Sequence, residues 1–231
     1  MNIRFFAIAA LVSGVAAFGQ LIPTNPGFPA ANGFGNGSDS AFQVRFASNL
    51  SFGDSVVNFS NAGGSSTAAN TTVAPFAQNG EICANVYAYS PDEQLVSCCS
   101  CNVTPNALNS LSVKNDLASN TLTPIIPSAL VIKVLATAGG AACTASKAAT
   151  VAAGDLVTGL LAWGTTIHAL PVTAGTPATT YGVVETAFSS PALSTAELTR
   201  MTQLCAFIRA NGSGYGICKS CKVGGLGASA R

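Results

Sequence analysis

Residues 82–101 read ICANVYAYSPDEQLVSCCSC, a stretch with four of the eight cysteines in two runs of strand-forming residues. Its first eight residues are rich in side chains that favour strands, and the SPDEQ segment after them is typical of a turn with Pro91 at the second position. The chain then returns through LVSCCSC, so we expect an antiparallel hairpin. In such a hairpin Cys83 faces residues 99–101, and facing Cα atoms about 4.5–5.5 Å apart are within disulfide reach.

Further strands are predicted by short apolar runs between turn residues. They are residues 42–47, 55–60, 110–115, 129–137, 158–170 and 181–188. Short strands with regular turn signals favour an antiparallel β-sandwich or a barrel-like domain, so the predicted fold class is mainly β. The segment 139–154, rich in Ala, Gly and Thr, is predicted to form a long loop that Cys143 holds in place.

One α-helix is predicted near the C-terminus, over residues 195–210. Ser194 and Glu197 match a capping box, in which two residues satisfy the first free N–H groups of a helix reciprocally. Apolar residues then recur at helical spacing, and the Asn-Gly pair at 211–212 is a stop signal. We expect Cys205, which lies on this apolar stripe, to bond the helix to the sheet. The stripe consists of Leu198, Met201, Leu204, Cys205 and Ile208.

The N-terminus has the parts of a secretion signal. A positive start, MNIR, precedes an apolar run over residues 5–18, and small residues at 17 and 19 fit the site that a signal peptidase reads. We therefore predict a signal peptide over residues 1–19. The apolar run is shorter than the roughly 20 residues that a membrane-spanning helix needs. The expected location is secreted, periplasmic or at the cell surface, with no membrane span after cleavage.

The rest of the chain divides into two parts. Residues 20–40 are rich in Pro, Gly and Asn and lack hydrophobic periodicity, which is typical of a flexible extension. Residues 41–231 are long enough for a single cysteine-rich β domain that ends in the helix. All eight cysteines lie in this second part.

The eight cysteines are disulfide candidates, because an even number in an exported chain is typical of a disulfide framework. Many pairings are open to eight cysteines, and the sequence does not choose among them. Three fall within residues 98–101, where they cannot easily close on one another. We therefore expect disulfides to join the C-terminal segment to the hairpin. The candidates are Cys83, Cys98, Cys99, Cys101, Cys143, Cys205, Cys218 and Cys221.

A metal or redox site is the first alternative for some of these cysteines. Cys218 and Cys221 form a C-x-x-C motif, and Cys98 and Cys101 have the same spacing, so four thiolates could hold zinc or an iron–sulfur cluster. An oxidising compartment favours disulfides over such a site. A c-type haem is excluded at the tail motif because Lys222, not His, follows it. We therefore predict no metal and no cofactor, with the thiolate site as the alternative.

A hydrolase that uses His168 is the second alternative. This is the only histidine, so a Ser-His-Asp triad would need it, with Asp155 or Asp116 as the acid. However, His168 lies in the apolar run LLAWGTTIHAL at residues 160–170, where a lone histidine is more typical of a hydrogen-bonded structural residue. The chain has no G-x-S-x-G, Walker A or H-E-x-x-H motif. We therefore assign no catalytic residues.

Charged side chains are scarce: Asp, Glu, Lys and Arg make up 8% of the chain, against roughly a quarter in ordinary globular proteins. The predicted signal peptide contains Arg4, and without it nine of the ten basic residues remain beside nine acidic ones. A net charge of zero gives no electrostatic basis for binding nucleic acid or an anionic membrane, so we expect neither as a partner.

Three cysteine-bearing segments carry a family resemblance: EICANVY at residues 81–87, CCSCNVTPN at 98–106 and GYGICKSC at 214–221. They are similar to a group of uncharacterised secreted cysteine-rich proteins of soil bacteria. The resemblance covers most of residues 55–225 and implies an exported domain held by cysteines, without a known activity, ligand or catalytic residue. The residues and the resemblance together favour a secreted, non-enzymatic surface, matrix or binding protein.

Overall fold

The computed structural model describes residues 40–63, 80–120, 125–170, 180–212, 215–218 and 221–223. All of them belong to one compact unit, Ala31–Arg231. A second unit, Met1–Ala30, lies outside the described residues. The predicted signal peptide and almost all of the predicted extension therefore stay predictions.

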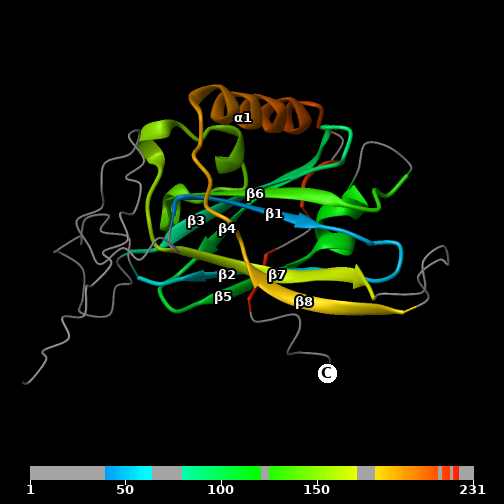
Figure 1. The fold of residues 1–231 in the computed structure, drawn as a ribbon. Helices are drawn as coiled ribbons and strands as arrows, with labels where there is room; N and C mark the ends of the chain where they lie inside the picture. The colour runs from blue at the N-terminus through cyan, green and yellow to red at the C-terminus, as the bar shows by residue number, and fades with distance from the viewer. Residues whose placement is uncertain are drawn as a thin grey trace, which may run out of the picture. The chain divides into compact units, whose positions relative to one another are not determined.

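The described residues form two antiparallel β-sheets and one long helix, which confirms the predicted mainly-β sandwich with a C-terminal helix (Figure 1). The first sheet has the order β1 (Phe42–Ala47), β6 (Leu130–Ala138), β3 (Ile82–Tyr89) and β4 (Leu95–Val103). The second has the order β8 (Tyr181–Ala187), β7 (Leu160–Ala169), β2 (Val56–Asn61), β5 (Leu108–Ser112) and the two-residue β9 (Lys222–Val223).

The first sheet is buried on both faces, and strand β3 shows this most clearly because all eight of its residues are buried. Successive side chains of a strand point to opposite faces. Ile82 and its alternate neighbours pack in the core between the sheets. Tyr87 and Tyr89 pack on the other face, in a second core that contains residues of the helix. In Figure 1 the helix α1 therefore lies over the first sheet, with the second sheet on the far side.

The helix α1 spans Thr195–Ala210, the predicted range. The Ser194 hydroxyl accepts a 3.1 Å hydrogen bond from the Glu197 N–H, which is one half of the predicted capping box. The other half, a bond from the Ser194 N–H to the Glu197 side chain, is wrong. The Glu197 carboxylate instead forms a 2.5 Å ion pair with Lys133 of β6, because the buried face of α1 brings it to that strand.

The predicted strand at 110–115 is partly wrong, since β5 ends at Ser112. The Asp116 carboxylate accepts a hydrogen bond from the Ser112 N–H, and the Ser112 hydroxyl accepts one from Asn115. These local bonds replace strand pairing and turn the chain into two short helices, η1 (Val113–Leu117) and η2 (Ala118–Asn120). The segment 139–155 holds three further single turns: η3 (Gly140–Ala142), η4 (Lys147–Ala149) and η5 (Ala153–Asp155).

Both edges of the first sheet are linked to the second sheet. At β1, Val44 exchanges two backbone hydrogen bonds with Ser189. Beside it the Gln43 amide donates to Leu160 O at 2.6 Å and accepts from Ala162 N at 3.1 Å. At the opposite edge, residues 216–218 run beside β4, and β9 then pairs with β5. Hydrogen bonds thus connect the two sheets at both edges of the sandwich, which gives it a partly barrel-like character.

Candidate functional site

The structure pairs all eight cysteines in four disulfides. Cys98 bonds Cys205 and so ties the helix to β4, as the place of Cys205 on the apolar stripe predicts. Cys143 bonds Cys83 and ties the long loop to β3. The other pairs, Cys99–Cys218 and Cys101–Cys221, tie the C-terminal tail to β4. Such a set of disulfides is typical of a protein from an oxidising compartment.

The expectation that Cys83 lies opposite residues 99–101 is wrong by one residue. The side chain of Cys83 also points to the opposite face of the sheet from those of Cys99 and Cys101. Cys83 pairs in register with Asn102. Its side chain shares a face of the sheet with Cys98, whereas Cys99 and Cys101 point into the core between the sheets. Because alternate residues of a strand point to opposite faces, Cys83 finds its partner in the loop above the sheet and not within the hairpin.

The four cysteines of the alternative thiolate site do not come together. Cys98 is bonded to Cys205 on the helix side of the first sheet, and Cys101 is bonded to Cys221 on the other side. A different set does cluster, because the Sγ atoms of Cys99, Cys101 and Cys221 lie within 4.8 Å of one another.

His168 lies near the end of β7, opposite Gly182 of β8, and its side chain is exposed. The expectation of a hydrogen-bonded structural histidine stays a prediction, since residues 171–179, which follow β7, lie outside the described residues. Asp155 is bonded to Lys147, and Asp116 to the Ser112 N–H. The structure therefore does not bring His168 together with either carboxylate that a triad would need.

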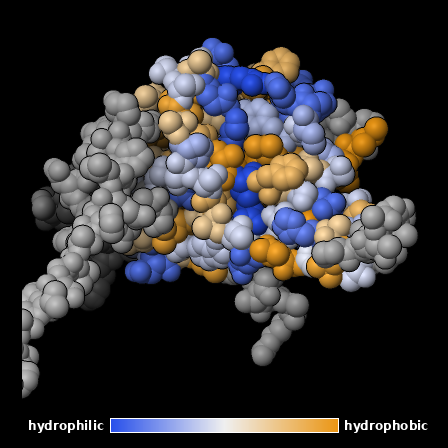
Figure 2. All heavy atoms as spheres, viewed as in Figure 1, coloured by the Kyte–Doolittle hydropathy of each residue, from blue (hydrophilic) through white to orange (hydrophobic). Residues whose placement is uncertain are grey.

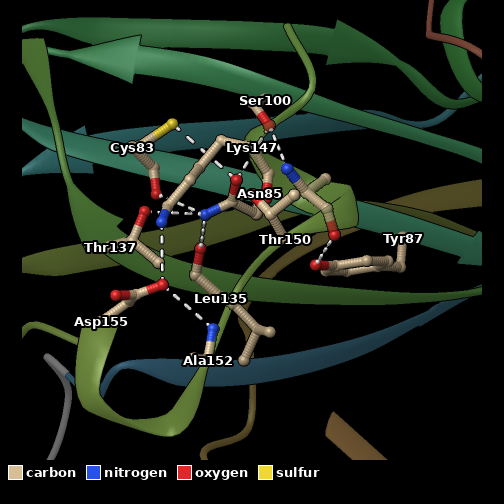
Figure 3. A network of polar contacts seen from close by, with 11 residues as sticks. Cys83, Asn85, Tyr87, Ser100, Leu135, Thr137, Lys147, Thr150, Ala152 and Asp155 are labelled. Carbon is tan, nitrogen blue, oxygen red and sulfur yellow. Dashed lines mark hydrogen bonds and ion pairs between the residues drawn. The ribbon is translucent and has the colours of Figure 1, made fainter. Parts of the chain in front are cut away.

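A polar network lies on the helix side of the first sheet, with Asn85 of β3 at its centre (Figure 3). The Asn85 side-chain N–H groups donate to Leu135 O and to the Thr137 hydroxyl, both at 3.1 Å, and its oxygen accepts from Ser100 at 2.8 Å. The Cys83 sulfur lies 3.8 Å from that oxygen. A disulfide sulfur carries no hydrogen, so this last contact is van der Waals packing.

The same network fixes the long loop. The Ser100 hydroxyl accepts a 2.8 Å bond from Ala148 N, and the Tyr87 hydroxyl donates a 2.6 Å bond to Ala148 O. Lys147 forms a 2.8 Å ion pair with Asp155, whose carboxylate also accepts from Ala152 N. The hydrogen bond from Lys147, helped by the one from Ala152, holds the pKa of Asp155 below its usual value. The polar side chains of this network thus bond to one another or to the backbone, so we interpret the network as structural.

A different arrangement occurs beside the β3–β4 turn, where a hollow of about 230 Å³ opens between the turn, β6 and α1. We call it the turn crevice; it is lined by Tyr89, Ser90, Pro91, Glu93, Val131, Lys133 and Arg200. An adjoining hollow of about 380 Å³ on the other side of the turn shares Ser90 and Pro91. The turn is closed by hydrogen bonds from Glu93 N to Ser90 O and from Ser90 N to Gln94 O, both 3.0 Å.

Tyr89, which lines the turn crevice, carries a buried polar atom without a partner. The Tyr89 hydroxyl oxygen is buried and has no hydrogen-bond partner among the described residues. Burial raises the pKa of Tyr89, the charge of Glu197 raises it further, and Arg200 lowers it. The Tyr89 ring also lies under Lys133, whose Nζ is 5.0 Å from the ring centre. A buried hydroxyl left unbonded in a native fold requires an explanation.

The two ion pairs of the turn crevice differ in strength. Lys133 and Glu197 are three-quarters buried and 2.5 Å apart. Arg200 and Glu93 are 3.3 Å apart, and their side chains are 46% and 78% exposed. Exposed pairs of this kind contribute little, so the Arg200 guanidinium is available for another anion.

The face of the molecule that carries α1 is mainly hydrophilic. Figure 2 shows mostly hydrophilic side chains over α1 and a mixture of hydrophobic and hydrophilic ones over the strands below. A larger hollow of about 640 Å³ lies along the outer side of α1, but residues of that helix alone line it, so it is an open surface. Within the described part of the chain, none of the helices has the length and apolar character needed to cross a membrane.

Comparison with models of known protein families, with curated proteins and with solved structures finds no match for this chain. The similarity to secreted cysteine-rich proteins of soil bacteria therefore stays a prediction.

Sequence reasoning did not find the turn crevice. It placed residues 90–94 in a turn, but Lys133 and Arg200 come from β6 and α1, which are far away along the chain. The one available signal was Tyr89 directly before the turn, and a tyrosine at a strand end is too common to indicate a site.

Proposed function

We propose that this protein is an exported, non-enzymatic binding protein that takes up a small organic carboxylate in the turn crevice. The observation that carries the proposal is the buried, unbonded hydroxyl of Tyr89 beside the loosely paired Arg200. The four disulfides and the predicted signal peptide support export, because disulfide frameworks are typical of proteins from oxidising compartments.

Arg200 is the group that selects an anion. A guanidinium offers five N–H donors, and the bond to the exposed Glu93 carboxylate uses one of them. A ligand carboxylate can replace Glu93 and accept two parallel hydrogen bonds, which is the stronger arrangement. When Glu93 moves aside, the ligand gains access to the Tyr89 hydroxyl, which then donates its missing hydrogen bond.

The size and lining of the turn crevice limit the ligand. Its volume, about 230 Å³, is below the roughly 300–1,000 Å³ of sites for drug-sized ligands, so we expect a ligand no larger than a single ring with its substituents. Pro91, Val131 and the Tyr89 ring supply apolar contact for the body of the ligand. Lys133 is the second positively charged residue of the turn crevice. Its charge is neutralised by the ion pair with Glu197, so it does not attract a second ligand anion.

The binding test is a titration of the full disulfide-bonded chain with benzoate, followed through backbone amide NMR signals. Benzoate should shift the signals of residues 90–94 and 131–133, whereas the neutral analogue benzamide should shift them far less. Arg200→Gln should weaken benzoate binding about tenfold or more, since a charged hydrogen bond is lost. Arg209→Gln, in the last turn of the same helix, is the matched control and should leave affinity unchanged. Equal affinity in both variants, or no shift near the turn, would disprove the site.

Tyr89→Phe separates binding from folding. Because the hydroxyl is buried without a partner, its removal should leave the free energy of unfolding unchanged or raise it by about 1 kcal/mol. The same variant should bind benzoate more weakly. A large loss of stability would mean that the hydroxyl already has a structural partner, which contradicts the proposed role.

Export is tested on the full chain produced in a bacterium with a general secretion pathway. The intact, non-reduced protein recovered outside the cytoplasm should begin at Gln20, and its mass should be lower by the eight hydrogens of eight oxidised cysteines. A product that stays in the cytoplasm with Met1 in place contradicts the export proposal.

A further inference from the structure

Two disulfides lie side by side between β4 and the C-terminal tail. Cys99 and Cys101 are two residues apart on one strand, so both side chains point to the same face. Their partners, Cys218 and Cys221, come from the tail, with Cα–Cα separations of 5.3 and 5.5 Å. The Sγ atoms of Cys99, Cys101 and Cys221 are within 4.8 Å of one another, and the Sγ of Cys218 is bonded to that of Cys99. Four sulfur atoms thus converge on one small region.

We propose that these four cysteines, when both disulfides are reduced, form a tetrahedral thiolate site for a thiophilic divalent cation such as zinc. A zinc ion holds thiolate sulfurs at about 2.3 Å, which places the sulfurs about 3.8 Å from one another. The Sγ atoms of Cys99, Cys101 and Cys221 already lie within 4.8 Å of one another, and that of Cys218 is bonded to Cys99. Reduction releases the two bonded pairs, whose sulfurs are about 2 Å apart, and side-chain rotations then bring the four sulfurs to the tetrahedral spacing. This inference is independent of the turn crevice.

The backbone around the site does not depend on the two disulfides alone. The tail is bonded to β4 through Cys98 N to Gly216 O at 2.8 Å and Cys218 N to Cys98 O at 3.3 Å. Four residues after Cys218, β9 begins and pairs with β5. The ligands therefore stay close after reduction. Cys221 is only half-buried, so a metal ion can enter from the tail side.

The conversion needs a reductant, which we take to be a dithiol or a phosphine. Each disulfide accepts two electrons and two protons and gives two thiols. A dithiol supplies both protons and becomes a disulfide, whereas a phosphine takes its oxygen from water, which also supplies the two protons, and becomes a phosphine oxide. Binding of the metal then releases four protons as the four thiols become thiolate ligands. The complex carries a net charge of −2, and Lys222 directly follows the ligand Cys221 in the chain.

Cys98 distinguishes this site from the thiolate set that the sequence suggested. Its sulfur lies on the helix side of the first sheet, bonded to Cys205, and the sheet separates it from the Cys99–Cys101 side. The spacing of the ligands is thus C-x-C on the strand and C-x-x-C on the tail.

The test uses the full chain, reduced with a phosphine under oxygen-free conditions and then titrated with Co²⁺. Co²⁺ absorbs visible light strongly when it is bound in a tetrahedral thiolate site. We expect one Co²⁺ per chain, displaced by Zn²⁺. Cys99→Ser/Cys218→Ser should weaken metal binding at least about 100-fold, because half of the ligands are lost. Cys98→Ser/Cys205→Ser, which also removes one disulfide, should keep it. Absence of tetrahedral Co²⁺ absorption in the unmutated protein, or equal loss in both variants, refutes the site.

A second measurement needs no variant. The reduced, zinc-loaded protein is treated with an alkylating reagent, and the modified cysteines are identified by mass spectrometry. Zinc should slow the alkylation of four cysteines at least about tenfold compared with the reduced, zinc-free protein; they are Cys99, Cys101, Cys218 and Cys221. Zinc should change the rates of the other four much less; they are Cys83, Cys98, Cys143 and Cys205. Protection of any other set overturns the assignment.

Discussion

Ser100 and Asn85 face each other across β4 and β3, and the Ser100 hydroxyl donates a 2.8 Å hydrogen bond to the Asn85 amide oxygen. Asn85 is fully buried, and its own N–H groups bond to β6. A single polar side chain therefore connects three strands of the first sheet, and through Ser100 it also reaches the long loop.

Asn85→Ala should destabilise the protein by about 3 kcal/mol. The substitution removes the acceptor of the Ser100 hydroxyl, which keeps only its bond from Ala148 N, and the donor to the buried Thr137 hydroxyl. Each buried polar group that loses its partner costs about 1–3 kcal/mol. The measurement is the midpoint of urea unfolding, and the control is Asn211→Ala at the exposed end of α1, which should change stability by less than about 0.5 kcal/mol. Similar losses in both variants would contradict the role of the network.

Removal of the Cys98–Cys205 disulfide, as Cys98→Ala/Cys205→Ala, should cost about 3 kcal/mol. The two cysteines are 107 residues apart, and a loop of that length alone would give about 5 kcal/mol. However, the Cys99–Cys218 disulfide still connects the residue after Cys98 to the tail that follows the helix. The covalent ring that the substitution opens therefore contains only residues 205–218 and the pair 98–99. A ring of about 15 residues gives about 3 kcal/mol. Denaturant unfolding of both proteins distinguishes the two values, and a loss near 5 kcal/mol would argue against the second disulfide.

Gly216→Ala should destabilise the tail. Gly216 has a φ of +75°, and an added Cβ would lie 2.6 Å from Ile208 of α1. We expect a loss of about 2–3 kcal/mol from strain and overlap together. Gly212→Ala has a similar φ of +67° but open space around it, so it should show only the smaller cost of the backbone conformation. Gly154→Ala has neither and should be close to neutral in the same thermal unfolding measurement.

Acid should loosen the long loop by protonating Asp155. Its pKa is below the usual value, chiefly because of the hydrogen bond from Lys147, so ionised Asp155 favours the folded state. This contribution is present above the pKa that Asp155 has in the unfolded chain, about 4, and it is lost as the pH falls through the lower folded value. The Ala152 amide signal in NMR reports this change, since that N–H donates to Asp155. It should titrate with a midpoint below about 4 and should not titrate in Asp155→Asn.

Much of the fold could be read from the order of the residues. The β3–β4 hairpin, most other strands and the helix at 195–210 follow from local patterns of apolar residues, turn residues and a Ser cap. The exception at 113–117 arose because Ser112 and Asp116 satisfy backbone groups locally, and such bonds compete with strand pairing. The turn crevice was beyond the sequence, since its charged residues meet only when α1 packs on β6.

Composition, strand pattern and the helix cap are local properties, so the order of the residues is enough to predict a mainly-β chain held by eight cysteines. Which sulfurs meet depends on how the strands, the loop and the helix pack in three dimensions. In β4, Cys98 points to the helix, whereas Cys99 and Cys101 point to the tail. The alternation of side chains along a strand sets this division, and its consequences depend on what packs against each face of the sheet.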